Sequence, residues 1–190
     1  MNQKSDAKEK ILKTAARLFQ RQGYHATGLS QIIAESGAPK GSLYYYFPNG
    51  KEELAVAAIE YTRDTNAQRL RTALARFDDP IRAFQSIMQD AAVDMHDVKD
   101  IVSCTISLLA LENALCSEPL RLACKSTYDA FRKVFIDKLG QCGFDPEQAY
   151  RLGGTVQMLI DGAFIRSLAE KNTQALLDVA DMIPQLLKRD

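Results

Sequence analysis

The sequence predicts an all-α protein. Apolar residues recur at helical spacing through nearly all of the 190 residues, and glycine or proline interrupts the pattern at intervals that suit helix ends. No segment shows the sustained alternation of apolar and polar residues that a half-buried strand requires. We expect about nine helices, and the chain is long enough for one or two domains with a substantial core.

Three short helices are expected at the N-terminus. The first has its apolar stripe around residues 11–19 and should end at Gly23. Thr27 is expected to cap a second helix over residues 28–36, because its hydroxyl can accept a hydrogen bond from an amide of the first turn. Pro39 then suits the start of a third helix.

Residues 40–47, KGSLYYYF, resemble a strand by propensity alone. A hairpin would need a second strand, yet residues 51–77 are strong helix formers that follow the break at Pro48-Asn49-Gly50. We therefore expect residues 40–47 to be helical, with Leu43 and Phe47 pointing inward one turn apart. The outward face and its flanks would then carry glycine, hydroxyl and phenol groups from Gly41, Ser42, Tyr44, Tyr45 and Tyr46.

Together these helices predict a helix-turn-helix whose second helix contacts DNA. Gly41 would let the backbone approach, and hydroxyl groups can bond phosphate oxygens or base edges. Thr27 and Lys51 lie at expected helix starts, where groups that bind phosphate are often found. The alternative is a three-helix bundle with surface tyrosines, although rows of exposed aromatic residues are rarely left without a partner.

Charge is unevenly distributed although the formal net charge is zero. Residues 1–51 contain eight Lys or Arg and three acidic residues, whereas the remainder contains sixteen basic and twenty-one acidic residues. The first part therefore carries +5 and the second −5. This asymmetry favours a polyanion partner for the N-terminal part alone.

The segment AARLFQRQGYHATGLSQIIAESGAPKGSLYYYFPNGKEEL resembles the DNA-binding domain of TetR-type transcriptional regulators. The resemblance covers roughly residues 7–55, and the wording GAPKGSLYYYFP is similar to the LmrA-like subgroup, whose members respond to drugs or flavonoids. By position it implies phosphate contacts from Thr27, Tyr44, Tyr46 and Lys51. It implies major-groove contacts from Lys40, Gly41, Ser42 and Tyr45. Pro39 departs from the frequent serine, and Tyr46 from the frequent histidine.

The resemblance further implies a DNA-binding domain over residues 1–50 and a helical ligand-binding and dimerisation domain over residues 51–190. A homodimer would form through the last two helices, expected at 145–170 and 173–188. Glycines would thin one face of the first of these, and apolar side chains would supply its surface. These are Gly153, Gly154 and Gly162, with Val156, Leu159, Ile160, Ala163 and Phe164. An internal core helix is the alternative.

Aromatic and methionine residues, with a few polar neighbours, are the candidate ligand contacts, because cavities for small molecules are mostly apolar and methionine adapts to varied shapes. They are Tyr61, Met88, Met95, Tyr128, Phe131, Phe135, Gln157 and Asp161. For each of them plain core packing is the alternative. Asp161 has the further alternative of pairing with a basic residue across the dimer.

Catalysis is not expected, and neither is a metal or cofactor. The two histidines are far apart, and no G-x-S-x-G, H-E-x-x-H, P-loop or glycine-rich dinucleotide motif occurs. No signal peptide and no apolar run of about 18 residues is found, so we expect a cytoplasmic protein. The cysteines, Cys104, Cys116, Cys124 and Cys142, lack metal-site spacing and are expected to be reduced, buried thiols, with a redox sensor or metal site as the alternative.

The sequence thus predicts a homodimeric transcriptional regulator, most simply a repressor. It would bind double-stranded DNA at a palindromic operator and be released by a hydrophobic or aromatic small molecule. Two alternatives remain: a DNA-binding architectural protein with no ligand, which would have no cavity in its body, and a helical protein that binds a partner instead of DNA.

Overall fold

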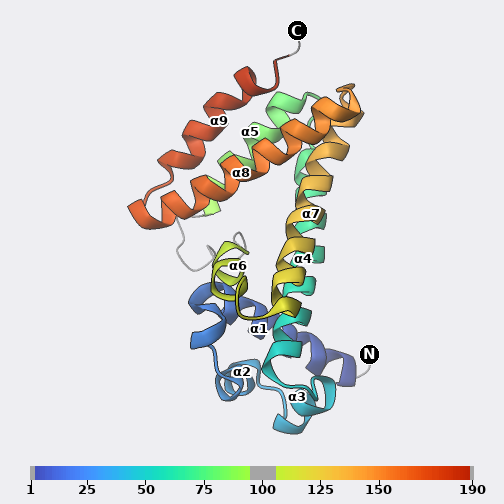
Figure 1. The fold of residues 1–190 in the computed structure, drawn as a ribbon, viewed down its shortest axis with the longest axis vertical. Helices are drawn as coiled ribbons and strands as arrows, with labels where there is room; N and C mark the ends of the chain where they lie inside the picture. The colour runs from blue at the N-terminus through green and yellow to red at the C-terminus, as the bar shows by residue number, and fades with distance from the viewer. Residues whose placement is uncertain (1–2, 95–105, 189–190) are drawn as a thin grey trace. The chain divides into compact units, whose positions relative to one another are not determined.

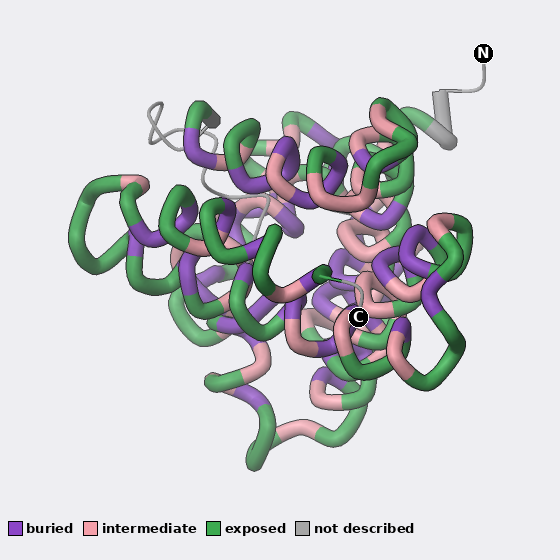
Figure 2. The backbone as a smooth tube through the Cα atoms, turned by 90° about the horizontal axis from the view of Figure 1, so that it is seen from above, coloured by how far each residue is buried: buried purple, intermediate pink, exposed green. Residues whose placement is uncertain are grey.

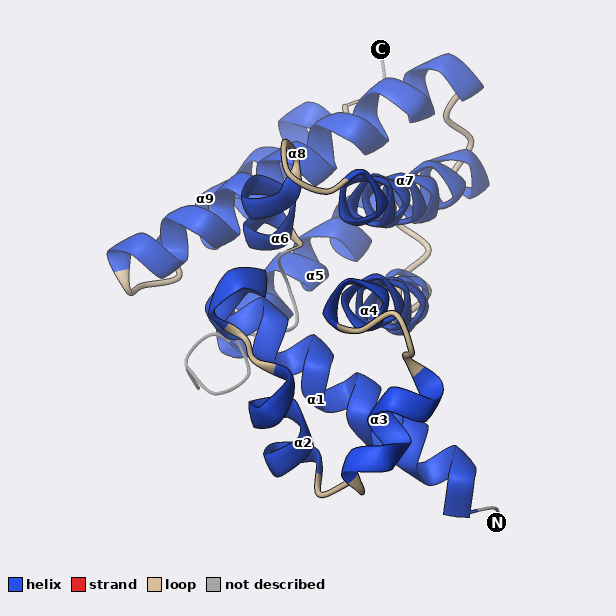
Figure 3. Ribbon diagram, turned by 60° about the horizontal axis from the view of Figure 1, so that its bottom comes forward, coloured by secondary structure: helices blue, strands red, loops and turns tan. Residues whose placement is uncertain are grey.

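The computed structural model describes residues 3–94 and 106–188, and every regular element within these ranges is a helix (Figure 3). The all-α prediction is therefore confirmed. The helices are α1 (Gln3–Ala26), α2 (Leu29–Ser36), α3 (Lys40–Tyr46), α4 (Lys51–Leu74), α5 (Pro80–Asp94), α6 (Ser107–Asn113), α7 (Glu118–Gln141), α8 (Pro146–Glu170) and α9 (Gln174–Leu186). In the described ranges no helix is long and apolar enough to cross a membrane.

The chain divides into two compact units. The N-terminal unit comprises Met1–Thr65 and Ile106–Thr127, and the C-terminal unit comprises Asn66–Thr105 and Tyr128–Asp190. Helices α4 and α7 each contribute residues to both units. The border between the two compact units therefore differs from the domain boundary expected at residue 50. The first part of α4 and all of α6 belong to the same unit as the helix-turn-helix.

In the N-terminal unit, α1 lies against α2, α3 and α6 (Figure 1). The core of this unit consists of large apolar side chains that are fully buried: Ile11, Phe19, Ile32, Leu43 and Leu54. Gly23 has a φ of 85° and a ψ of 169°, so the axis of α1 is broken there, although helical turns resume as far as Ala26. Gly23 thus ends the straight part of α1 as expected, and only a glycine adopts this backbone conformation readily.

The turn between α2 and α3 follows from its residues. Gly37 closes α2 in the left-handed conformation, and Pro39 precedes the first residue of α3. The capping role predicted for Thr27 is wrong: Gly28 is the N-cap of α2, and the Thr27 hydroxyl donates to the Gly23 carbonyl at 2.7 Å. Thr27 therefore stabilises the end of α1 instead of the start of α2.

In the C-terminal unit, α9 packs on both α5 and α8 (Figure 1). Along individual helices, buried and exposed positions alternate within each turn (Figure 2). The predicted start of α8 is confirmed, since the Asp145 carboxylate accepts hydrogen bonds from the amides of Glu147 and Gln148 at 3.0 and 3.1 Å, with Pro146 in the first turn.

The apolar side of α8 that was predicted to form the dimer surface lies mostly in the core of the C-terminal unit. For those residues the alternative of an internal core helix is correct. Val156, Ile160, Ala163 and Phe164 are buried, and only Leu159 of that group is exposed. A helix of this composition is apolar on two sides, and periodicity does not tell which side meets the core. The large apolar residues that α8 and α9 do expose are Tyr150, Met158, Leu159, Ile165, Leu168, Leu177 and Met182.

The cysteines of the described ranges have different environments. Cys124 is buried, as predicted, and burial raises the pKa of its thiol to about 11. Cys142 is half-buried, whereas Cys116 is exposed, so the prediction of burial is wrong for Cys116. Cys104 lies outside the described residues.

Candidate nucleic-acid interface and ligand cavity

Helix α3 has one buried and one exposed side, as its sequence predicted. Leu43 and Phe47 are buried against the rest of the N-terminal unit. Tyr45 lies on the opposite side and is 71% exposed, and Tyr44 is also exposed. Two turns of helix are thus anchored by two apolar side chains, and phenol groups remain available at the surface.

The exposed side of α3, here called the reading face, comprises Lys40, Gly41, Ser42, Tyr44, Tyr45 and Tyr46. A Cβ built on Gly41 would meet no atom within 4 Å, so the backbone is open to an approaching molecule at this point. The rings of Tyr45 and Tyr46 lie edge to face with their centroids 5.0 Å apart. This contact holds the two phenols in one arrangement, and less side-chain entropy is lost when they bind a partner.

Lys51, the first residue of α4, lies beside the kink of α1. Its Nζ is 4.4 Å from the centre of the Tyr24 ring and 3.5 Å from the carbonyl oxygen of His25. Partial burial lowers the pKa of Lys51, and the nearby Glu112 carboxylate acts in the opposite direction. Thr27, by contrast, is only 1% exposed, and its hydroxyl is occupied by the bond to Gly23.

A carboxylate from α6 holds the kink of α1 in place. Glu112 Oε2 accepts a hydrogen bond from the Tyr24 amide at 2.6 Å. The same carboxylate fills the space where a side chain at Gly23 would lie. We name Gly23, Tyr24 and Glu112 the kink anchor. Sequence reasoning missed Glu112, because its partners are about ninety residues away and no local pattern marks it.

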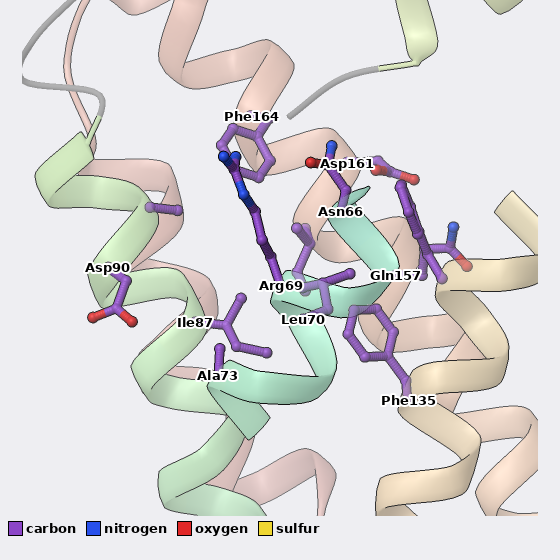
Figure 4. A pocket seen from close by; sticks show the side chains of 13 residues that line it. Asn66, Arg69, Leu70, Ala73, Ile87, Asp90, Phe135, Gln157, Asp161 and Phe164 are labelled. Carbon is purple, nitrogen blue, oxygen red and sulfur yellow. The ribbon is translucent and has the colours of Figure 1, made fainter. Parts of the chain in front are cut away.

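The C-terminal unit contains a cavity of about 250 Å³. Four of the predicted ligand contacts line it: Phe131 and Phe135 from α7, and Gln157 and Asp161 from α8. Side chains from α4 and α5 complete the walls, as the labelled residues of Figure 4 show. An architectural protein without a ligand was expected to lack such a cavity, so this feature counts against that alternative.

The other predicted contacts do not line the cavity. Tyr61 belongs to the N-terminal unit, and Met88 is fully buried in the core of the C-terminal unit. Tyr128 is half-buried but lies outside the lining, and Met95 lies outside the described residues. For Met88 the structure supports the alternative of plain core packing.

Sequence reasoning missed all the lining residues of α4 and α5 and two from α8. The missed polar residues are Asn66, Arg69 and Asp90. The missed apolar residues are Leu70, Ala73, Ile87, Ala91, Ile160 and Phe164. The spacing of Asn66, Leu70 and Ala73 along α4 places them on one side of that helix, but a periodic stripe looks the same whether it faces a cavity or a core.

Two polar side chains of the cavity, Asp161 and Gln157, are poorly compensated by the described residues. Burial raises the pKa of the Asp161 carboxyl to about 6. The Gln157 side chain is 7% exposed, and its Nε2 has no hydrogen-bond partner among the described residues. Asp90 differs, because it forms an ion pair with Arg76 at 2.5 Å. No cluster of His, Cys, Asp and Glu in the described part of the chain could hold a metal ion.

Comparison with known proteins identifies the family. Residues 11–58 match the profile of bacterial regulatory proteins of the tetR family, and residues 80–182 match that of the C-terminal domain of LmrA/YxaF-like transcriptional regulators. The chain belongs to the TetR family. The resemblance seen in the helix-turn-helix segment is confirmed by these matches, and with it the N-terminal helix-turn-helix and the helical C-terminal domain. The chain is thus a DNA-binding transcriptional regulator.

Two relatives from Bacillus subtilis strain 168 match this TetR-family regulator over almost its whole length. An uncharacterised HTH-type transcriptional regulator, YxaF, is 44% identical over 100% of this chain and 99% of its own. The HTH-type transcriptional regulator LmrA is 42% identical over 97% of this chain and 98% of its own. Both matches support the narrower resemblance to the LmrA-like subgroup.

Solved structures share the fold at much lower identity. The reduced form of NemR from E. coli has a TM-score of 0.81 at 23% identity, covering 95% of this chain and 96% of its own. A TetR-family regulator from Cytophaga hutchinsonii has a TM-score of 0.83 at 18% identity, covering 100% of this chain and 99% of its own. These likenesses concern the fold alone.

Proposed function

We propose that this TetR-family protein is a ligand-responsive repressor that binds a palindromic operator as a dimer. One observation carries the proposal: the chain combines an exposed, hydroxyl-rich reading face on α3 with a separate, mostly apolar cavity in the C-terminal unit. DNA recognition and ligand binding therefore have distinct residues, which is the arrangement that a coupling between two sites requires.

The proposed DNA contacts, from the reading face and from Lys51, fall into two groups according to the part of the duplex that they would meet. We assign Lys40, Gly41, Ser42 and Tyr45 to the major groove, where side chains and close backbone approach distinguish base pairs. Tyr44, Tyr46 and Lys51 are assigned to phosphates, which position the protein without specifying sequence. Thr27 is left out of this set, because its hydroxyl is buried and already bonded.

The exposed apolar side of α8 and α9 supports the dimer. Met158, Gly162 and Ile165 lie along one stripe of α8, and a Cβ at Gly162 would meet no atom of the chain within 4 Å. Leu159 and Met182 line a shallow apolar groove between the two helices. Exposed apolar surface of this kind marks interaction sites, and pairing of two copies through it would make a four-helix bundle.

A symmetric dimer would present two reading faces to one duplex. Their half-sites would be inverted repeats whose centres lie about 34–36 Å apart, one helical turn of DNA. A small apolar or aromatic molecule in the cavity would favour a conformation with the wrong separation of the reading faces. A coupling of about 3 kcal/mol corresponds to a roughly 150-fold weaker operator affinity.

This coupling would be tested with an operator fragment obtained by selecting the sequences that the protein binds from a random DNA pool. Small aromatic compounds would be screened for release of that fragment by fluorescence anisotropy, with wild type beside Ala91→Trp, which places an indole in the cavity from α5. We expect wild type to be released and Ala91→Trp to have lost the response. Ala114→Trp, an exposed position in the N-terminal unit, is the matched control and should respond as wild type does. An unchanged response of Ala91→Trp would show that the effector binds elsewhere.

A further inference from the structure

We propose that the cavity selects organic cations: ring-bearing amines whose ammonium group binds Asp161 while their rings lie among phenylalanine side chains. The proposal rests on the function proposed above, in that the cavity is taken to be the effector site, and it adds the charge of the effector. The argument has three parts: the carboxylate, the rings and the buried amide.

Asp161 is a carboxylate with no counter-charge among the residues that the structure describes. It lines the cavity from α8 and is half-buried, and no ion pair or hydrogen bond joins it to any of the described residues. Figure 4 shows its carboxyl group beside the cavity, on the same side as Asn66. A partly buried charge is costly unless it is paired, so the group that gains most at this position is a cation supplied by the ligand.

The charged groups around Asp161 do not supply that cation. Arg69 lines the cavity from α4, but it is exposed and forms no ion pair with Asp161. Asp90, from α5, is occupied by Arg76, and the lining residues of α7 are phenylalanines. The raised pKa of Asp161 agrees with this, because desolvation is its only cause and a close guanidinium would lower the pKa.

Aromatic rings complete the environment for a cation. Phe131 and Phe135 of α7 and Phe164 of α8 line the same cavity. The face of an aromatic ring attracts an ammonium group, and the attraction grows when both are shielded from water. The three rings also provide the apolar surface that the ring system of a ligand would cover.

Gln157 adds a requirement for an acceptor. It lies four residues before Asp161, so the two side chains leave the same side of α8 one turn apart. Its Nε2 is buried and has no partner among the described residues, and a buried donor in this condition is destabilising until an acceptor reaches it. The ligand we infer therefore carries an oxygen or aromatic nitrogen near its ammonium group.

Three methoxynaphthalenes of equal shape, each with its ether oxygen as the acceptor for Gln157, test the charge preference: an aminomethyl compound, a hydroxymethyl compound and a naphthoate with the same ring positions. Their affinities for the whole protein would be measured by calorimetry at about pH 7.5, where the amine is a cation and Asp161 is mostly ionised. We expect the amine to bind about tenfold more tightly than the alcohol, and naphthoate to bind most weakly. Equal or tighter binding of the alcohol or of naphthoate would overturn the proposal.

Asp161→Asn should abolish the preference for the amine, because the amide keeps the shape and removes the charge. Asp90→Asn is the matched control in the same cavity and should keep the preference, since Arg76 already neutralises Asp90. A preference that survives Asp161→Asn would refute the assignment. Wild type provides a second test that requires no variant: the advantage of the amine should shrink between about pH 7.5 and pH 5, as Asp161 becomes protonated. An advantage that is constant over this range would also refute it.

The outcomes separate this inference from the function on which it rests. An amine that binds through Asp161 without weakening operator binding would support the cation site and contradict the proposed effector response. A neutral compound that binds and releases the operator would support the effector response and contradict the cation site. Absence of binding by all three compounds would overturn the cation site, and the screen for release of the operator would then decide the effector response by itself.

Discussion

Replacing Met158 by Asp should convert the protein into a monomer whose operator affinity is lower by about 10³-fold or more. Met158 is 68% exposed on α8, so the substitution should leave the fold of one chain intact. In the proposed dimer the same side chain would be buried against the partner, where an unpaired carboxylate is strongly unfavourable. A monomer engages one half-site only, and its binding should approach the non-specific range.

Analytical ultracentrifugation and operator titration would be carried out on the same samples. Leu115→Asp is the matched control, because Leu115 is a 99% exposed leucine in the N-terminal unit, outside α8 and α9. It should remain dimeric and bind the operator normally. If Met158→Asp were still a dimer with unchanged affinity, the dimer would have to use another surface.

Gly23→Ala should destabilise the protein by about 2–3 kcal/mol and weaken DNA binding although Gly23 is not among the proposed DNA contacts. An alanine resists the φ of 85° at this position, and its Cβ would overlap the Glu112 carboxylate of the kink anchor. Relief of the overlap would move the Glu112 carboxylate away from the Tyr24 amide, and loss of that hydrogen bond would loosen the end of α1, which leads directly into the helix-turn-helix. Urea denaturation followed by circular dichroism measures the loss of stability.

A double-mutant cycle with Glu112→Ala separates the two causes. In the Glu112→Ala background, Gly23→Ala should lower the free energy of unfolding by a smaller amount, because the overlap with the carboxylate is absent. The part of the loss that comes from backbone strain at residue 23 should remain. If the two substitutions had strictly additive effects on the free energy of unfolding, the overlap with Glu112 would not contribute to the effect of Gly23→Ala. Glu112→Ala alone should also destabilise, because the Tyr24 amide loses its acceptor.

The sequence predicted which side of α3 is buried and which is exposed for a physical reason. In a two-turn helix, Leu43 and Phe47 are the large apolar residues at a spacing of four, so only one orientation buries both. Both residues belong to one short segment, so the prediction does not require knowledge of the distant elements against which they pack. The fold class followed in the same way, from the helical spacing of apolar residues and from glycine and proline at helix ends.

Interactions between distant segments could not be predicted in this way. The kink anchor joins α1 to α6, and the cavity is built from α4, α5, α7 and α8. Thr27 was misassigned because a threonine next to a helix start can bond either forward to an amide or back to a carbonyl, and the break at Gly23 decides in favour of the carbonyl. In α8 both sides are apolar, so sequence alone could not separate core from exposed surface.

Selection of bound sequences from a random DNA pool, at near-physiological salt, tests most directly whether the reading face recognises bases in a dimer. The account predicts that wild type enriches an inverted repeat with half-site centres about 34–36 Å apart. It also predicts that Tyr45→Ala binds this repeat about 1–3 kcal/mol more weakly, with relaxed preference at particular positions of each half-site. A pool that stays random with wild type would contradict base recognition by α3. An enriched sequence that Tyr45→Ala recognises equally well would contradict the role of Tyr45.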